Sequence, residues 1–190
     1  SNYSLTVKMR LGFMKLEEGI LVTELLNKYP LKGVIIHART GKQMYTGNVD
    51  LEGFGALNNL CKHEVTYNGD VFTPENLTRI CQRFPTLDNF MLGRGALRNP
   101  FLPSMIKGHT LAPLDKISMI RQFHAEIYSH YKKVLSGDKH LCDKMSEFWE
   151  YMSIHFDSDG KFIKRIKKCH TSLDYLNTVE QLFIGKSFTD

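Results

Sequence analysis

The sequence predicts an α/β fold in residues 5–97, followed by an all-helical segment. Apolar runs that read as strands alternate there with helical patterns, and repeated strand–helix units of this kind favour a parallel sheet. From residue 114 onward the strand signals vanish, and apolar residues recur at helical spacing instead. Three of the six prolines lie between the two patterns, in residues 98–113. We therefore expect two domains, at residues 1–105 and 106–190.

Four strand–helix units are expected in the first domain. The predicted strands cover residues 5–12, 33–40, 64–70 and 89–97, with helical patterns between them at residues 15–29, 50–62 and 73–84. The second run is almost continuously apolar, which is typical of a strand buried on both faces of a parallel sheet. The tail carries helical patterns at residues 114–135, 143–156, 161–170 and 172–183, which are enough for a small helical bundle.

The composition permits several kinds of partner. Lys and Arg total 25 against 20 Asp and Glu, so the net charge is +5, which allows a polyanionic partner without requiring one. No apolar run reaches the ~20 residues of a membrane span, and the N-terminus has no signal-peptide pattern. The four cysteines are scattered without metal-type spacing, so we expect free thiols, no metal site and a cytoplasmic location.

Each predicted strand delivers polar residues to its C-terminal end, where the loops of parallel sheets form ligand sites. Lys8 lies within an otherwise apolar strand, and an unpaired buried charge is costly, so its ammonium must reach a partner or water. The polar residues and glycines at the strand ends are Lys8, Arg10, His37, Arg39, Asn68, Gly69, Asp70, Gly93, Arg94 and Gly95.

Two glycines and an arginine at the third and fourth strand ends give the clearest functional signal. Gly69 and Gly93 leave room for an anion to approach the backbone, and the Arg94 guanidinium offers a fork of donors suited to phosphate. Taken singly, each loop is a common turn or a flexible segment. Their occurrence at consecutive strand ends, together with Lys8 and His37, favours a phosphorylated ligand.

Four segments resemble the successive strand-end motifs of a known family. They read VKMRLG, IIHARTGKQMYTG, YNGDVFTPENL and MLGRGALRNPFL, and they occur in this order within residues 5–102. Together they are similar to tRNA-dihydrouridine synthases, flavoproteins that reduce uridine in tRNA to 5,6-dihydrouridine with FMN and a nicotinamide cofactor, usually NADPH. The second segment is specific by itself, whereas the Asn-Gly-Asp and Gly-Arg-Gly loops also occur in other flavin barrels.

The resemblance implies that residues 1–105 are the C-terminal portion of a TIM (β/α)8 barrel that binds FMN, and that residues 106–190 are a helical tRNA-binding domain. It also implies that Lys8 meets the flavin ring, and that His37 lies near the flavin phosphate or the uracil. The implied contacts of the ribityl chain and phosphate are Asn68, Gly69, Asp70, Gly93 and Arg94. The implied contacts of RNA, or of the flavin edge, are Arg39, Lys42 and Gln43.

The chain departs from the family pattern in one respect. The family's catalytic cysteine lies in an Asn-x-Gly-Cys-Pro motif, which these 190 residues lack, so His37 is the one catalytic candidate and we expect little or no activity of the chain alone. Four βα units also leave open sheet edges. Three explanations stay open: a truncated or proteolysed enzyme, pairing with a second copy, or a first half that lies outside this sequence.

Basic residues cluster in residues 161–168 around three apolar ones, so one helix face can pack while the other presents cations to phosphates. A solvated helix face explains this pattern equally well, and it is the resemblance that favours tRNA. Two other functions stay open: an FMN barrel that acts on a small molecule, and a non-catalytic RNA-binding fragment. The cations concerned are Lys161, Lys164, Arg165, Lys167 and Lys168.

Overall fold

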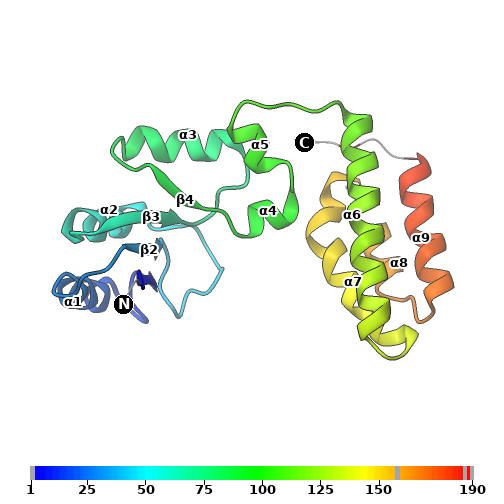
Figure 1. The fold of residues 1–190 in the computed structure, drawn as a ribbon, viewed down its shortest axis with the longest axis horizontal. Helices are drawn as coiled ribbons and strands as arrows, with labels where there is room; N and C mark the ends of the chain where they lie inside the picture. Colours follow the sequence, from blue (N-terminus) through cyan, green and yellow to red (C-terminus); the bar gives the residue numbers. More distant parts are fainter. Residues whose placement is uncertain (1–2, 157–158, 186–187, 189–190) are drawn as a thin grey trace. The chain divides into compact units, whose positions relative to one another are not determined.

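Four parallel strands form the sheet of the first part of the chain in the computed structural model, in the order β1-β2-β3-β4 (Figure 1). The strands are β1 (Thr6–Arg10), β2 (Gly33–His37), β3 (Glu64–Asn68) and β4 (Asn89–Met91). The structure describes residues 3–156, 159–185 and 188. The predicted α/β fold with a four-stranded parallel sheet is confirmed. Each strand is shorter than its predicted range, because loops begin within that range.

Three helices connect the strands: α1 (Leu16–Leu26), α2 (Leu51–Leu60) and α3 (Pro74–Arg83). Because the strand order never reverses, right-handed crossovers place all three on one face of the sheet, as Figure 1 shows. Val34, Ile36 and Tyr67 are buried on that face. On the other face β2 is only partly covered, since Ile35 stays partly exposed there while His37 is buried. Helices on one side only are consistent with part of a TIM barrel.

Local sequence signals start two of these helices. The Asp50 carboxylate accepts a hydrogen bond from the Gly53 amide at 2.8 Å and caps α2. At α3, Thr73 and Asn76 cap one another reciprocally, and Pro74 occupies the first turn, where its missing N–H costs nothing. These caps fix where α2 and α3 begin, and so they also fix the ends of the loops that connect β2 to α2 and β3 to α3.

The chain divides into two compact units, Ser1–Ala96 and Leu97–Asp190. Short α4 (Arg94–Arg98) spans the division, and the described part of the second unit contains helices only. These are α5 (Leu102–Ile106), α6 (Pro113–Val134), α7 (Asp138–Met152), the 3-10 turn η1 (Ser153–His155), α8 (Lys161–Ile166) and α9 (Ser172–Gly185). The assignment of an FMN-binding domain up to residue 105 and a tRNA-binding domain after it stays a prediction.

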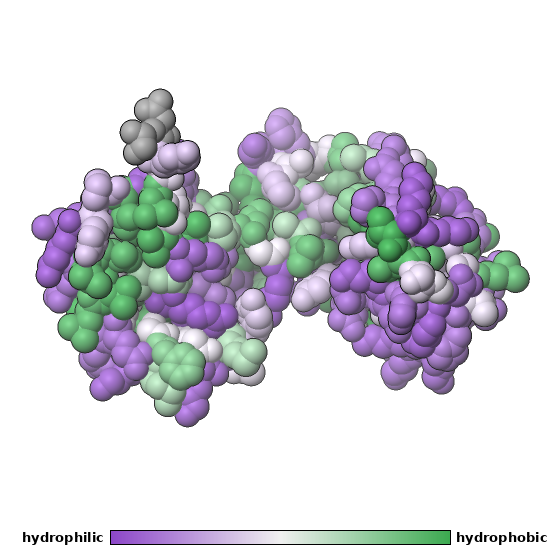
Figure 2. Space-filling model, turned by 60° about the horizontal axis from the view of Figure 1, so that its bottom comes forward, coloured by the Kyte–Doolittle hydropathy of each residue, from purple (hydrophilic) through white to green (hydrophobic). Residues whose placement is uncertain are grey.

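The helical unit is built around Trp149, which is fully buried. Its indole Nε1 donates a hydrogen bond to the Tyr175 hydroxyl at 2.9 Å, and that hydroxyl lies 2.6 Å from His124 Nε2. The direction of this second hydrogen bond depends on the tautomer of the His124 ring. Polar residues cover most of this unit in Figure 2, at the right of the view. Among the described residues, no helix combines the length and apolar character of a membrane span.

The buried His124 side chain predicts a loss of stability in acid. Burial lowers its pKa from 6.5 to about 4, whereas an unfolded histidine takes up a proton near pH 6.5. Neutral His124 therefore contributes fully to the free energy of unfolding above pH 6.5. As the pH falls toward 4, the free energy of unfolding decreases by about 3 kcal/mol. Urea unfolding measured from pH 7 to pH 4 should show this decrease of the free energy of unfolding with falling pH. In His124→Phe this pH dependence should be absent.

Exposed His140 provides the matched control, because His140→Gln should leave the pH slope as it is in the original chain. An NMR titration of the His124 ring gives the pKa directly. A pKa of 6 or higher, or a pH slope that His124→Phe does not change, would contradict the prediction.

Candidate functional site

The C-terminal ends of the four strands meet at one pocket with a volume of about 120 Å³. The strand register pairs Arg10 with His37, His37 with Asn68, and Asn68 with Met91, so the strands end at the same level. Every residue that the sequence assigned to a cofactor lines this pocket. The lining residues are Lys8, Arg10, His37, Tyr45, Asn68, Gly69, Asp70, Val71, Phe72, Met91, Gly93, Arg94 and Gly95.

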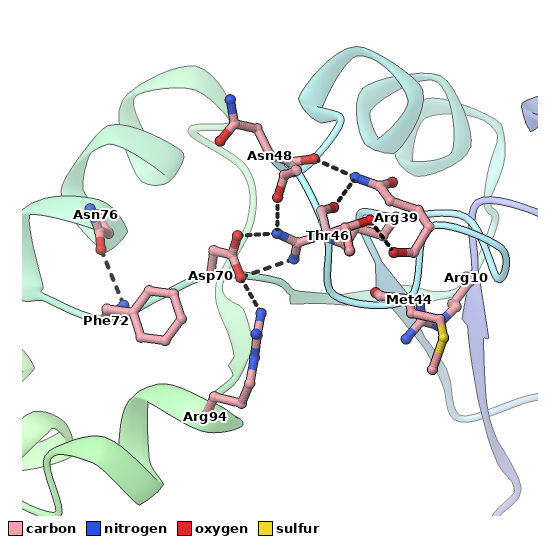
Figure 3. Close-up of polar contacts among 11 residues, drawn as sticks. Arg10, Arg39, Met44, Thr46, Asn48, Asp70, Phe72, Asn76 and Arg94 are labelled. Atoms are coloured by element: carbon pink, nitrogen blue, oxygen red, sulfur yellow. Dashed lines mark hydrogen bonds and ion pairs between the residues drawn. The ribbon is translucent and has the colours of Figure 1, made fainter. Parts of the chain in front are cut away.

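Asp70 lies between two arginines at the edge of the pocket (Figure 3). Its two carboxylate oxygens accept hydrogen bonds from both terminal nitrogens of Arg39, with an Nη1–Oδ1 distance of 2.9 Å. Oδ1 also accepts from Arg94 Nη2 at 2.8 Å. Burial alone would raise the pKa of Asp70, but the hydrogen bond and charge of Arg39, with the charge of Arg94, lower it overall. Asp70 is therefore a carboxylate at neutral pH.

The loop after β3 depends on its glycine. Gly69 has a φ of +148°, and a Cβ there would lie 2.9 Å from Val49 Cγ1 and 3.1 Å from the Tyr67 hydroxyl. The next residue, Asp70, also has a positive φ, 38°. The Asn68 side-chain amide donates to the Met91 carbonyl at 2.8 Å, which ties β3 to β4. The small turn thus has a structural reason in addition to any role in binding.

The pocket is electropositive on the side of β1 and β2. Burial lowers the pKa of His37 to about 4, and the charges of Arg10, Lys8 and Arg39 act in the same direction, so His37 is neutral at pH 7. The pKa of Lys8 is also lowered, by partial burial and then by the charge of Arg10. Lys8 is exposed on the sheet face that the helices leave open, so its ammonium reaches water.

The three residues expected to contact RNA after β2 differ in their exposure and in their hydrogen-bond partners. Lys42 is exposed. The Gln43 side-chain amide instead donates to two carbonyls of its own loop, that of Thr46 at 2.9 Å and that of Asn48 at 2.7 Å. The Arg39 side chain is only 1% exposed and is bound by Asp70. An RNA contact by Arg39 is therefore not supported, because its guanidinium is enclosed by the protein's own loops.

Arg10 and Tyr45 line the pocket, although the sequence analysis placed Arg10 at a strand end without assigning it a ligand and did not single out Tyr45. Arg10 donates to the carbonyls of Thr40 and Met44, both at 2.8 Å, and so holds the loop after β2. The Arg94 guanidinium carbon lies 4.3 Å from the centroid of the Tyr45 ring, a distance typical of a cation–π contact. The strand-end position of Arg10 was visible in the sequence, because it follows Lys8 by two residues and shares its strand face. No periodicity distinguishes Tyr45, which lies in an irregular loop.

The basic segment of the second unit has the two faces that its sequence predicted. Phe162 and Ile166 are buried, and the cations are exposed. Some cations have protein partners: Lys161 pairs with Asp159 and Lys167 with Glu150, both at 2.7 Å, and Arg165 donates to Gln181 at 2.6 Å. The other two exposed cations of this segment are Lys164 and Lys168.

Comparison with known proteins finds matches over most of the chain. The family model described as Dihydrouridine synthase (Dus) matches residues 2–185. The tRNA-dihydrouridine synthase B of Shewanella oneidensis is 27% identical over 149 residues, which are 72% of this chain and 46% of that protein. The tRNA-dihydrouridine(16) synthase of Escherichia coli is 21% identical over 183 residues, which are 95% of this chain and 56% of that protein.

The chain thus spans about half the length of these curated relatives. The family match extends over both units, including the helical one, for which the sequence motifs alone carried little information. This chain belongs to the dihydrouridine synthase (Dus) family.

Proposed function

We propose that the chain is the C-terminal part of a flavin-dependent tRNA-dihydrouridine synthase. Residues 1–105 would be four of the eight βα units of a TIM barrel, and residues 106–190 a tRNA-binding helical bundle, in a cytoplasmic enzyme. The observation that carries the proposal is the single pocket that collects the cofactor residues from four separate strand ends. The proposal is also supported by the family match and by the position of α1, α2 and α3 on one face of the sheet.

The residues present fit one end of FMN. A Cβ built at Gly93 would meet no atom within 4 Å outside its two chain neighbours, so the backbone at this edge of the pocket is open. Lys8 and Arg10 add positive charge to the same pocket. The pocket volume of about 120 Å³ is well below the roughly 300–1,000 Å³ of sites that enclose a whole small ligand, so this chain would supply only part of the site.

The residue roles follow from these positions. Arg94 and Gly93 would hold the phosphate, and Asn68, Gly69 and Asp70 the ribityl chain, with Asp70 also orienting Arg94. Lys8 would place a cation at the flavin ring. His37, neutral at pH 7, would offer a hydrogen bond to uracil without adding charge. FMN itself, when bound, carries a hydride from NADPH to the uracil ring.

The chain alone is proposed to lack activity, since the family's cysteine motif is missing. Cys61 lies at the end of α2 and Cys81 within α3, away from the strand-end loops. The open edges of β1 and β4 need a cover, which the rest of a longer enzyme or a second copy of the chain would supply. The half-length coverage of the relatives favours a longer enzyme.

The activity is tested in cells that lack the gene of the complete protein. Their tRNA is expected to lose dihydrouridine at one or more positions, and the complete gene should restore it, whereas residues 1–190 alone should not. Unchanged tRNA in the deletion cells would rule out the proposed reaction and would favour an FMN barrel that acts on a small molecule.

Lys164 and Lys168 are predicted to contact tRNA phosphates. Each is exposed, and replacing either with Ala should reduce the slope of log affinity against log salt by about 1. Binding of labelled tRNA at several salt concentrations measures the slope. Lys107→Ala, which removes an exposed lysine outside the basic segment, is the control and should leave the slope unchanged. Equal slopes for all the variants would favour a merely solvated helix face.

A further inference from the structure

We infer that Arg39 is a positioning residue, which orients Arg94 toward an anionic ligand through the carboxylate of Asp70. The inference rests on the proposed function in one respect, namely that Arg94 binds the phosphate of FMN. It replaces the expected RNA contact of Arg39 with a role inside the protein. Arg39 itself would touch neither the cofactor nor the RNA, because its side chain is 1% exposed.

Arg39 joins the loops that follow three different strands. Its side chain binds both oxygens of Asp70, after β3, and donates through Nη2 to the Gly47 carbonyl at 2.7 Å, in the loop after β2. Its own carbonyl accepts from the Leu11 amide at 3.1 Å, directly after β1. A planar guanidinium can make these bonds together, whereas a lysine ammonium cannot bind two carboxylate oxygens in a fixed plane.

The bidentate contact has a consequence for Asp70. The residue has a φ of 38°, in the left-handed region, which Asp adopts more readily than most residues but which still favours restraint by its surroundings. The two bonds from Arg39 supply that restraint and define the plane of the carboxylate. Without them, the loop after β3 could relax, and the oxygen that faces Arg94 would no longer have a defined position.

Asp70 in turn holds Arg94 by a single terminal nitrogen. Oδ1 accepts from Arg94 Nη2 at 2.8 Å, and the Arg94 side chain is 30% exposed, so its other donors can reach a ligand in the pocket. Tyr45 and Phe72 lie under the same guanidinium, at 4.3 and 5.6 Å from their ring centroids. Side chains from the loops after β2 and β3 thus surround Arg94, and Arg39 is the buried member of this arrangement.

The experiment compares the affinities of the 190-residue chain for FMN and riboflavin, which differ only in the phosphate. Arg39→Lys is expected to weaken FMN binding about 10- to 100-fold, the range of one lost charge-assisted hydrogen bond, and to weaken riboflavin binding much less. Arg83→Lys, at an exposed arginine that pairs with Glu52, is the matched control and should change neither affinity. Equal losses for both flavins, or no loss for FMN, would overturn the inference.

A second pair of variants separates positioning from folding. Asp70→Asn should weaken FMN binding more than riboflavin binding, since Asp70 is also proposed to contact the ribityl chain that both flavins share. Arg39→Lys should add no further loss in the Asp70→Asn background, because the two residues act as one unit. Additive losses would overturn the inference. If Arg39→Lys fails to fold, Asp70→Asn still decides it: riboflavin binding must weaken clearly less than FMN binding, and equal losses would contradict the inference.

Failure of the proposed FMN site can be told apart from failure of this inference. If the original chain binds neither flavin, the FMN assignment fails for this chain, and the carboxyl titration of Asp70 by 13C NMR becomes the test. Arg39→Lys should raise the Asp70 pKa and shift the NMR signals of the Arg94 guanidinium. An unchanged Asp70 pKa together with unchanged Arg94 signals would overturn the positioning role.

Discussion

Trp149→Ala is expected to lower the free energy of unfolding of the helical unit by about 3–5 kcal/mol. The indole is fully buried, packs edge-on against Phe148 and Phe162 with ring centroids 5.0 Å apart in both cases, and donates to the Tyr175 hydroxyl. Its removal leaves a large cavity and takes the hydrogen-bond donor from a buried hydroxyl. Urea unfolding followed by circular dichroism at 222 nm measures the change.

Tyr151→Ala is the matched control for this variant, because it removes an aromatic residue of the same helix that is 37% exposed. It should cost well under half as much stability as Trp149→Ala. Similar costs for the two variants would show that the core of this unit lies elsewhere. Because the chain has two units, the transition assigned to the helical unit should shift while that of the sheet unit stays.

Arg94→Met is expected to weaken FMN binding by about 100-fold, if the guanidinium gives the phosphate two charge-assisted hydrogen bonds. Methionine keeps much of the side-chain volume over Tyr45 and removes the charge and all the donors. Riboflavin, which has no phosphate, should bind equally to both forms. Flavin fluorescence titration measures both affinities at a fixed salt concentration.

Arg79→Met, at an exposed position of α3, removes one positive charge from the same unit and controls for the net charge. It should leave FMN binding within about twofold, because a surface charge away from the pocket is screened by salt. FMN affinities that are equal in Arg94→Met and the original chain would remove Arg94 from the proposed site.

Most of the residues that line the pocket could be predicted from the sequence, because a single topological rule for parallel sheets brings them together. The carboxyl ends of parallel strands meet at one edge, so Lys8, His37, Asn68 and Arg94 were expected together although they are far apart in the chain. The rule says which residues meet and says nothing of which donor faces which acceptor. The bonds of Asp70 to its two arginines therefore came only from the structure.

Arg39 shows why the remaining part of the site could not be predicted. Strand alternation puts it two residues after His37 and so on the same face, at the pocket mouth. In the structure β2 ends at His37, and the Arg39 amide donates back to the His37 carbonyl at 2.7 Å. This three-residue turn changes the direction of the chain, so the guanidinium lies in the protein interior instead of facing the solvent.

The sequence by itself determined the four strand–helix units, the helical character of the tail and the family resemblance, because these depend on local periodicity and on short motifs. Tertiary structure alone decided the roles of individual charges. Lys8 lies in water, Arg39 is buried against Asp70, and some of the exposed cations of residues 161–168 pair with protein side chains. Such roles depend on distances and angles between residues that lie far apart in the chain, which a linear pattern does not contain.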